Sequence, residues 1–360
     1  MRLKILLVLI ILTSQSVAGE NTFHLDSPYN DGTLRLEIDN DLIWSRDSNF
    51  TSGWSLQYHT VRYNDWEDAA APPFCKWIGL KFPTLSDNDS IVRLSHGVGQ
   101  IMITPEDITN PNPLEGDLPY AGTLTYSLNW QSFNRQIARN FQITVGVLGE
   151  ESYAGSVHEF LHDVWGWGEN PSGWHTQRET EPAVNLGYQH VWRLAKIGIY
   201  TNDWAGQIYL GTTGLLGNLM TSLDVGFGFR VGWNMQEGFT SFPAPPGVGI
   251  FQSAHIPKPG SASPHGIELV AGVRGMGLVY SVIYDGSLLN DDDRQVEREN
   301  FVFSGLVGLN YHYYKRLSLR LTLVKTSDLL IEQRLPTPRP GQKKTNTDNS
   351  FGTLMIDFHF

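Results

Sequence analysis

Cysteine, charge and long apolar runs are all scarce in this sequence. Its 360 residues include one cysteine, Cys75, so the chain cannot form an internal disulfide. Charged residues make up 18%, below the roughly 25% typical of soluble domains. After the first residues, no stretch approaches the roughly 20 apolar residues that a membrane helix needs. If the chain crosses a membrane, it must therefore do so as a closed β-barrel, the other structure that satisfies its backbone hydrogen bonds there.

The first residues have the pattern of an export signal. Arg2 and Lys4 precede an apolar run over 5–12, and the small residues of "SVAG" offer a cleavage site. This pattern predicts a signal peptide over 1–18, with a buried first helix as the alternative interpretation. The remaining residues, 19–360, contain no repeats and no interdomain linker, and they are interpreted as one domain. The 37 acidic residues outnumber the 26 basic ones, which argues against a nucleic-acid partner.

Period-2 alternation gives the main evidence for the fold. In "GTLMIDFHF", the last residues of the chain, Leu354, Ile356, Phe358 and Phe360 alternate with more polar residues. Similar alternation occurs in "TLRLEI", "GTLTYSLNW", "SLDVGFGFRVGW" and "RLSLRLTL". Segments of about 10 residues with one apolar face are what a transmembrane barrel requires. The sequence therefore predicts an all-β fold, a transmembrane antiparallel β-barrel of about 12 strands in the bacterial outer membrane.

The order of the strands assigns a side to each connection. If the N-terminus starts in the periplasm, the extracellular connections are the long ones. They are expected over 42–53, 103–120, 149–182, 234–264, 287–300 and 326–350.

The longest inter-strand connection, over 149–182, contains the pattern "HEFLH". Apolar residues between Gly155 and Gly166 recur at helical spacing, which predicts a short helix over the barrel mouth or rim. His158 and His162, at positions i and i+4, then share one face of it. The pattern matches the zinc-protease signature, in which Glu159 would be the catalytic residue. The extended signature fails, however, because Trp165 and Gly168 occupy its glycine and third-histidine positions.

A set of short motifs resembles the outer-membrane lipid A 3'-O-deacylases, the LpxR family. These are an Asn-Asp pair at residues 40–41, then "NFTSG", "GQIMITPED", "GDLPYAG", "GVLG" followed by the two histidines, and "GWHTQ". Their order and spacing agree with the family over most of the chain up to Gln177. The sequence departs from the family at three places: His158 stands where the family has Gln, Leu118 replaces an Arg, and Asn110 lies near the place of a Lys that some members carry.

The resemblance implies an esterase that hydrolyses the 3'-O-linked acyloxyacyl chain of lipid A. It implies His162 as the general base and Asp41 as a ligand of Ca²⁺, with the active site on the extracellular side. Asn40 is expected to bind the metal or the ester carbonyl. Further catalytic-site residues are expected at Thr51, His158 and Glu169, where they would orient water or His162. The implied partner is lipid A, or lipopolysaccharide, in the outer leaflet, and the protein is expected to act as a monomer.

Two other functions stay open at this point. The protein could be a passive barrel, a pore or a structural protein, whose loop histidines do no chemistry. It could also be a zinc endopeptidase that uses "HEFLH".

Overall fold

The computed structural model describes residues 32–41, 49–87, 90–112, 116–165, 170–198, 203–235, 238–239, 254–255, 263–313, 316–331 and 348–360. The predicted signal peptide, residues 1–18, lies outside them. The elements in order are β1 (Thr33–Asn40), β2 (Asn49–His59), α2 (Pro73–Lys81), β3 (Ile91–Thr104), β4 (Ala121–Phe133), β5 (Ile137–Leu148), η2 (Glu150–Ser152), α3 (Ala154–Trp165), η3 (Trp174–Thr176), β6 (Glu181–Gly198), β7 (Trp204–Gly217), β8 (Met220–Trp233), β9 (Gly238–Phe239), β10 (Ala254–His255), β11 (His265–Ser281), α4 (Val282–Asp285), β12 (Phe301–Tyr313), β13 (Leu317–Thr326) and β14 (Phe351–His359).

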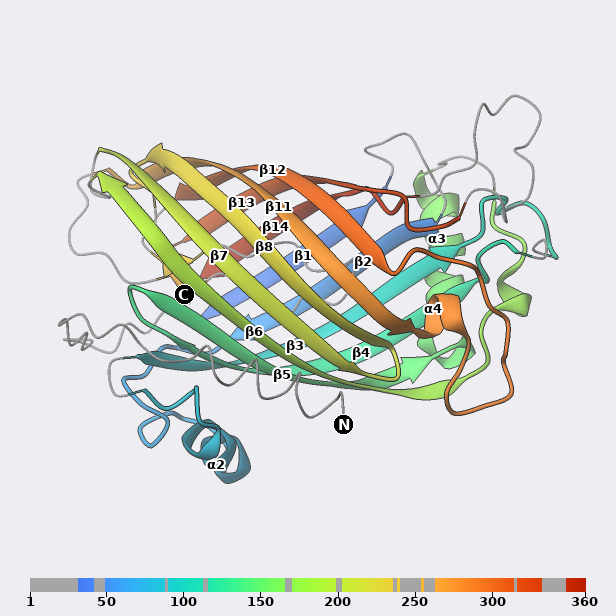
Figure 1. The fold of residues 1–360 in the computed structure, drawn as a ribbon, viewed down its shortest axis with the longest axis horizontal. Coiled ribbons are helices and arrows are strands. Elements are labelled where there is room, and N and C mark those ends of the chain that lie inside the picture. The colour runs from blue at the N-terminus through green and yellow to red at the C-terminus, as the bar shows by residue number, and fades with distance from the viewer. Residues whose placement is uncertain are drawn as a thin grey trace.

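Twelve antiparallel strands form a closed barrel, as the alternation in the sequence predicted (Figure 1). The first and last strands close it: β1 pairs with β14 along its whole length, from Thr33 opposite His359 to Asn40 opposite Gly352. The remaining two strands, β9 and β10, form a small separate sheet. Among the residues that the structure describes, no helix is both long and apolar enough to cross a bilayer.

The predicted alternation separates an apolar outer face from a lumen. Leu34 and Ile38 of β1 are 38% and 40% exposed on the outside, whereas Arg35 and Glu37 between them are buried. The same parity continues on β14, where Leu354 and Phe358 are exposed and Asp357 is buried. Exposed apolar side chains around the outer wall are the surface that a bilayer solvates.

Ion pairs fill the lumen near the chain termini. Asp357 accepts hydrogen bonds from Arg35 on one neighbouring strand, at 2.9 Å, and from Arg320 on the other, at 2.8 Å. Farther round the wall, Arg230 pairs with Glu268 at 3.1 Å, and Glu268 also contacts His312 at 3.0 Å. Because buried charges are tolerated only when they are paired and hydrogen-bonded, these contacts fix strands β1, β8, β11, β12, β13 and β14 in register.

Apolar side chains fill the opposite end of the lumen. Phe50, Met276 and Phe351 belong to one buried cluster together with Val282 and Tyr284 of α4. Figure 1 shows α4 at this end of the barrel, opposite the C-terminus. The lumen is therefore lined by charges near the termini and by a hydrophobic core near α4.

One predicted connection lies at the wrong end. A two-residue turn, Asn218 and Leu219, joins β7 to β8, so three strands lie between the 149–182 and 234–264 connections, where two connections on the same side require an even number. The chain direction is reversed as a result, and the 234–264 connection lies at the end that carries the termini. The other five predicted connections, 42–53, 103–120, 149–182, 287–300 and 326–350, lie at the end that carries α3 and α4.

We expect Asp357→Asn to destabilise the barrel by about 3–5 kcal/mol, because the substitution leaves Arg35 and Arg320 as buried charges without their carboxylate. The measurement is urea unfolding followed by tryptophan fluorescence in detergent. Asp68→Asn, at an exposed residue between β2 and α2, is the control and should leave the midpoint unchanged. Equal midpoints for the two variants would contradict the role given to Asp357.

Candidate active site

Helix α3 packs against the outside of the barrel wall. Val98 of β3 is exposed to the outside, so Met102, four residues farther on, points the same way. Met102 is nevertheless fully buried, because Ala154 of α3 and Trp174 pack in the same cluster. Gly122 of β4 permits this approach, since a Cβ there would lie 2.2 Å from that of Ala154. The helix was predicted over the mouth or rim, and the structure places it against the outer wall near that rim.

The start of this loop is anchored to the wall by polar contacts. Gln100 of β3 donates from Nε2 to the carbonyl oxygen of Ser152 at 2.7 Å and accepts the indole N–H of Trp54 at 3.0 Å. Ser152 lies in η2, the 3₁₀ turn that leads into α3. These bonds fix the first turn of the helix relative to β2 and β3.

The end of β1 and the start of β2 bring together three predicted site residues. The Asn40 side chain donates to the carbonyl oxygen of Thr51 at 3.1 Å, and the Asp41 backbone N–H donates to the same oxygen at 3.5 Å. The hydroxyl of Thr51 contacts that of Thr104 at 2.6 Å. The pairing of β2 with β3 shifts register between Phe50 and Ser52, so Thr51 is the extra residue of a β-bulge, a device that re-aims a side chain. Asp41 and Thr51 are both buried.

The two histidines of α3 form a direct pair, as their spacing predicted. Their Nε2 atoms lie 3.1 Å apart, and the rings meet edge to face with centroids 4.6 Å apart. The indole Nε1 of Trp174 lies 3.1 Å from Nδ1 of His158. Both imidazoles are buried, whereas Glu159 between them is exposed.

Trp174 fixes the direction of this chain of hydrogen bonds. An indole N–H can only donate, so Nδ1 of His158 accepts and neutral His158 carries its proton on Nε2. That proton is donated to Nε2 of His162, which therefore carries the lone pair, while the proton of His162 is on Nδ1. Burial, together with the charge that His162 can carry, lowers the pKa of His158 to about 3. His158 is thus a neutral donor at physiological pH.

This tautomer argues against the zinc interpretation of "HEFLH". A zinc ligand must offer a lone pair, and Nε2 of His158, the atom that faces His162, carries a proton instead. The exposed Glu159 does not share the face of the two histidines. Within the described ranges, no group of three or more His, Cys, Asp or Glu residues gathers as metal ligands would.

The structure groups five of the six predicted residues into two clusters. One contains Asn40, Asp41 and Thr51, and the other contains His158 and His162. They are connected through β3, whose Met102 pairs in register with Ser52 and packs in the same cluster as Trp174. The sixth predicted residue, Glu169, lies outside the described residues.

Two residues were missed as site candidates although their motifs were recognised. Trp174 belongs to "GWHTQ" and Thr104 to "GQIMITPED". The motifs include both residues, but the sequence does not show that Trp174 contacts His158 or that Thr104 contacts Thr51. These contacts form only in the folded chain.

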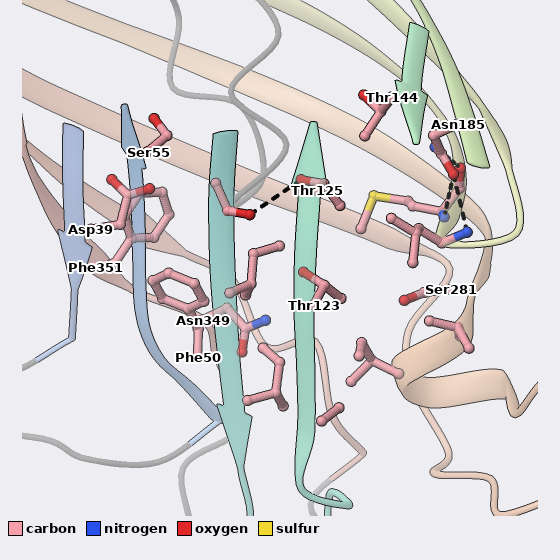
Figure 2. Close-up of a pocket in the computed structure, with 18 of the residues that line it drawn as sticks. Asp39, Phe50, Ser55, Thr123, Thr125, Thr144, Asn185, Ser281, Asn349 and Phe351 are labelled. Atoms are coloured by element: carbon pink, nitrogen blue, oxygen red, sulfur yellow. Dashed lines mark hydrogen bonds between the residues drawn. The ribbon is translucent and has the colours of Figure 1, made fainter. Parts of the chain in front are cut away.

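A separate cavity of about 150 Å³ lies inside the barrel (Figure 2). Asp39, Ser55, Thr123 and Thr125 contribute polar groups to it, and apolar residues such as Phe50 line the rest. None of the five predicted site residues that the structure describes lines this cavity. We therefore place the candidate site on the outer wall, where the histidines are, and not in the lumen.

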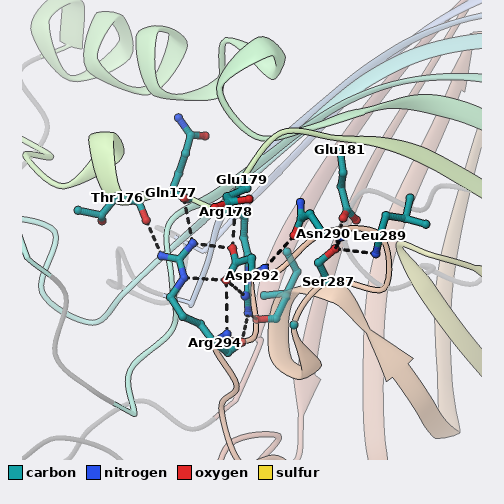
Figure 3. Close-up of polar contacts among 12 residues, drawn as sticks. Thr176, Gln177, Arg178, Glu179, Glu181, Ser287, Leu289, Asn290, Asp292 and Arg294 are labelled. Carbon is teal, nitrogen blue, oxygen red and sulfur yellow. Dashed lines mark hydrogen bonds and ion pairs between the residues drawn. The ribbon is translucent and has the colours of Figure 1, made fainter.

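An ion-pair cluster ties the segment after α3 to the connection between β11 and β12 (Figure 3). Arg178 donates to Asp292 at 2.9 Å, and Arg294 donates to the same carboxylate at 2.6 Å. Burial opposes ionisation of Asp292, but the bonds and charges of Arg294 and Arg178 outweigh it and lower the pKa of this carboxyl to about 2. Arg178 therefore holds two loops together.

The fold and the site together define a closed β-barrel with a candidate site on its outer wall, beneath a loop helix. The sequence profile of the family described as "Outer membrane protein LpxR" matches residues 5–344, so the chain belongs to the LpxR family and is an outer-membrane protein.

Solved structures with a similar barrel fold are also found. The structure of LpxR from Salmonella typhimurium matches with a TM-score of 0.67 at 18% identity, covering 91% of this chain and 100% of that chain. The β-domain of the Bordetella autotransporter BrkA matches with a TM-score of 0.43 at 7% identity, covering 92% of this chain and 100% of that one. A search of curated proteins finds no match.

The low pKa of His158 predicts that α3 loosens in acid. In the unfolded chain this histidine takes up a proton near its usual pKa of 6.5, whereas in the folded protein it does so only near pH 3. Stability linked to His158 is therefore complete above about pH 6.5 and is lost as the pH falls toward 3, at up to about 1.4 kcal/mol per pH unit. Hydrogen exchange of the α3 amides, corrected for intrinsic rates, measures it.

In this experiment His158→Gln should remove most of the acid sensitivity, because a carboxamide does not titrate. His175→Gln, at an exposed histidine of the same loop, is the matched control and should keep the wild-type profile. Identical profiles for His158→Gln and wild type would refute the assignment of a depressed pKa to His158.

Proposed function

We propose that the protein is an outer-membrane esterase that hydrolyses the 3'-O-linked acyloxyacyl chain of lipid A. The observation that carries this proposal is the buried pair of His158 and His162 on α3, held against the outer wall at the end of the barrel where Asp41 and Thr51 also lie. Membership of the LpxR family supports the substrate class.

We propose that the end carrying α3 faces the cell exterior. Three of the five connections at the end with the termini are short, over 134–136, 199–203 and 314–316, whereas 218–219 is the one short connection at the other end. Outer-membrane barrels have short turns toward the periplasm and longer loops outside. This orientation brings the site to the outer leaflet, where lipid A is located, and agrees with an N-terminal signal peptide.

A site on the outer wall can receive its substrate directly from the bilayer. Phe160 and Val164, at i and i+4 on α3, are 61% and 55% exposed and form an apolar face away from the barrel. The histidine pair lies on the opposite, buried side of the helix. An acyl chain could therefore move along α3 to the histidines without leaving apolar surroundings.

His162 is the proposed general base. Its Nε2 carries the lone pair, so this atom accepts a proton from the attacking water as the water oxygen bonds to the ester carbonyl carbon. The water must displace the N–H of His158 from this lone pair, which costs about 1 kcal/mol for one neutral hydrogen bond. When the bond from the carbonyl carbon to the ester oxygen breaks, His162 returns the proton to the leaving alkoxide. The products are the acyloxyacyl acid and the sugar alcohol.

His158 holds His162 before the reaction. Because the depressed pKa of His158 keeps it neutral, it does not repel the positive charge that forms on His162. Thr51, on the β-bulge, is proposed to help position the attacking water. The same orienting role is proposed for Glu169, which stays a prediction.

The residues at the end of β1 fit a hard cation. Asp41 offers a buried carboxylate and Asn40 an amide oxygen, the type of donor that Ca²⁺ prefers over nitrogen or sulfur. We propose that Asp41, with Asn40, holds Ca²⁺. Bound Ca²⁺ would supply Lewis-acid stabilisation of the negative charge that develops on the carbonyl oxygen of the ester. The protein is expected to act as a monomer.

The filled lumen supports an enzyme over a passive pore. Asp357 with its two arginines occupies the lumen near the termini, and the apolar cluster around Phe50 and Tyr284 occupies the other end. A wide water-filled pore would need both regions to be open.

We expect His162→Ala to lower the deacylation rate by about 10²–10⁴-fold, the usual contribution of a general base. The measurement is mass spectrometry of lipid A from cells that express the variant or the wild type. His158→Gln restores the family's residue and should retain activity, because a carboxamide can also hydrogen-bond to His162. Wild-type conversion by His162→Ala, with the barrel folded, would contradict the proposal.

We also expect activity to depend on calcium through Asp41. A calcium chelator should abolish deacylation by the purified protein, and added Ca²⁺ should restore it while Zn²⁺ should not. Asp41→Asn should require more Ca²⁺ for half-maximal rate, since it removes the carboxylate charge. Full activity of the wild type in chelator would exclude the metal from the mechanism.

A further inference from the structure

The connection between β2 and β3 contains the helix α2, which has no part in the proposed chemistry. Figure 1 shows α2 outside the barrel wall, toward the end that carries the C-terminus and away from α3 and α4. The helix is nine residues long and starts at Pro73, a favourable first position because proline fixes the helical φ angle.

The inner face of α2 is fixed to the wall. Trp130 points outward from β4 and donates its indole N–H to the carbonyl oxygen of Cys75 at 2.8 Å. Gly79 lies against the ring of Trp66, where a Cβ would come within 2.4 Å of the indole. Trp66 in turn donates to the carbonyl oxygen of Leu85 at 2.8 Å. These contacts hold α2 against the barrel wall, so its outer face points away from the wall.

That outer face is apolar and is exposed in the part of the chain that the structure describes. Phe74, Trp77 and Leu80 recur at every third position of α2 and are 56%, 62% and 38% exposed. An aromatic side chain as exposed as Trp77 is unusual on a surface that faces only water, and tryptophan is enriched where a membrane meets water.

The apolar face of α2 continues the outer surface of the barrel. On β3, β4 and β5 the outward side chains Val98, Tyr126 and Val145 are 42%, 40% and 44% exposed, as expected of a wall in contact with lipid. Closer to α2 on two of these strands, the outward side chains Leu94 and Leu128 are buried beneath the α2 connection. The connection thus replaces lipid over this part of the wall and presents new apolar side chains farther out.

The charges around α2 suit a phospholipid surface. Between Ala69 and Ser86 the charged residues are Lys76 and Lys81, with no acidic residue. Basic side chains beside an apolar helix face are typical of helices that lie in the interface plane, where phosphates attract lysine. The acidic residues that the structure describes in this connection lie outside this span: Asp65, Glu67 and Asp68 precede the helix, and Asp87, which follows it, pairs with Arg139 at 2.7 Å.

We propose that α2 is a membrane-docking helix that inserts Phe74, Trp77 and Leu80 into the phospholipid headgroup region at the terminus-bearing end of the barrel. In the orientation proposed above, this is the periplasmic leaflet. Such helices bury their apolar face by about 5–10 Å, so the outer face of α2 lies just below the headgroups. Docking fixes the depth and tilt of the barrel, and with them the height of the site at the other end.

Site-directed spin labelling tests this proposal in the full chain. A nitroxide is attached to Trp77→Cys or Leu80→Cys in a Cys75→Ala background, and the protein is reconstituted into phosphatidylcholine vesicles that contain phosphatidylglycerol. Collision rates are then measured with oxygen, which concentrates in lipid, and with a water-soluble nickel chelate. Asp68→Cys, on the polar part of the same connection, is the matched control. A shift in electrophoretic mobility between unheated and heated samples verifies that each variant is folded.

We expect the ratio of oxygen to nickel collisions to be several-fold higher at residues 77 and 80 than at residue 68. High nickel accessibility at 77 and 80 would overturn the proposal by placing α2 in water. Low accessibility to both reagents would also overturn it, since protein, a second copy of the chain included, would then cover the helix. Deacylation by the same variants is a separate measurement, so a failure of docking would leave the proposed esterase untouched.

Discussion

The rest of the structure depends on closure of the barrel between its first and last strands. Asp357 on β14 lies between Arg35 on β1 and Arg320 on β13, and all three side chains are buried in the lumen. A shift of one residue in this pairing would turn these charges toward the bilayer, so the ion pairs select a single register. That register sets where β1 ends, and the end of β1 is where Asn40 and Asp41 lie. The register in which the barrel closes therefore also sets the positions of Asn40 and Asp41.

The candidate site uses the outer surface of the barrel rather than its interior. Two local features make this possible: a β-bulge at Thr51 and a glycine at 122 that lets α3 approach β4. Because α3 is held against the wall, its two faces differ. The buried face carries His158 and His162, and the exposed face carries Phe160 and Val164. At the other end of the barrel, α2 also packs against the outside of the wall, and it presents Trp77 outward. Both helices add side chains to the outside of a wall whose strands alone would only contact lipid.

Strand alternation allowed the fold to be predicted, because a lipid-facing wall and a polar lumen impose a period of two on every strand. The i, i+4 spacing likewise predicted that His158 and His162 would share a helix face. The direction of the 234–264 connection was wrong, since a two-residue turn at Asn218 and Leu219 has little signal in a continuous run of alternation. Contacts between distant segments were out of reach for another reason. Trp174 donates to His158, 16 residues away, and Arg178 pairs with Asp292, 114 residues away. The amino-acid composition does not indicate which polar groups come into contact.

In the proposed reaction, a water molecule that is deprotonated by His162 attacks the carbonyl carbon of a lipid A ester at this outer-wall site. The most direct measurement is deacylation by the purified protein in ¹⁸O-labelled water, with mass spectrometry of both products. Attack at the carbonyl carbon places one ¹⁸O atom in the carboxyl group of the released acyloxyacyl acid and none in the sugar, and His162→Ala releases no acid above background. Label in the sugar hydroxyl, or labelled acid released equally by His162→Ala, would contradict the account.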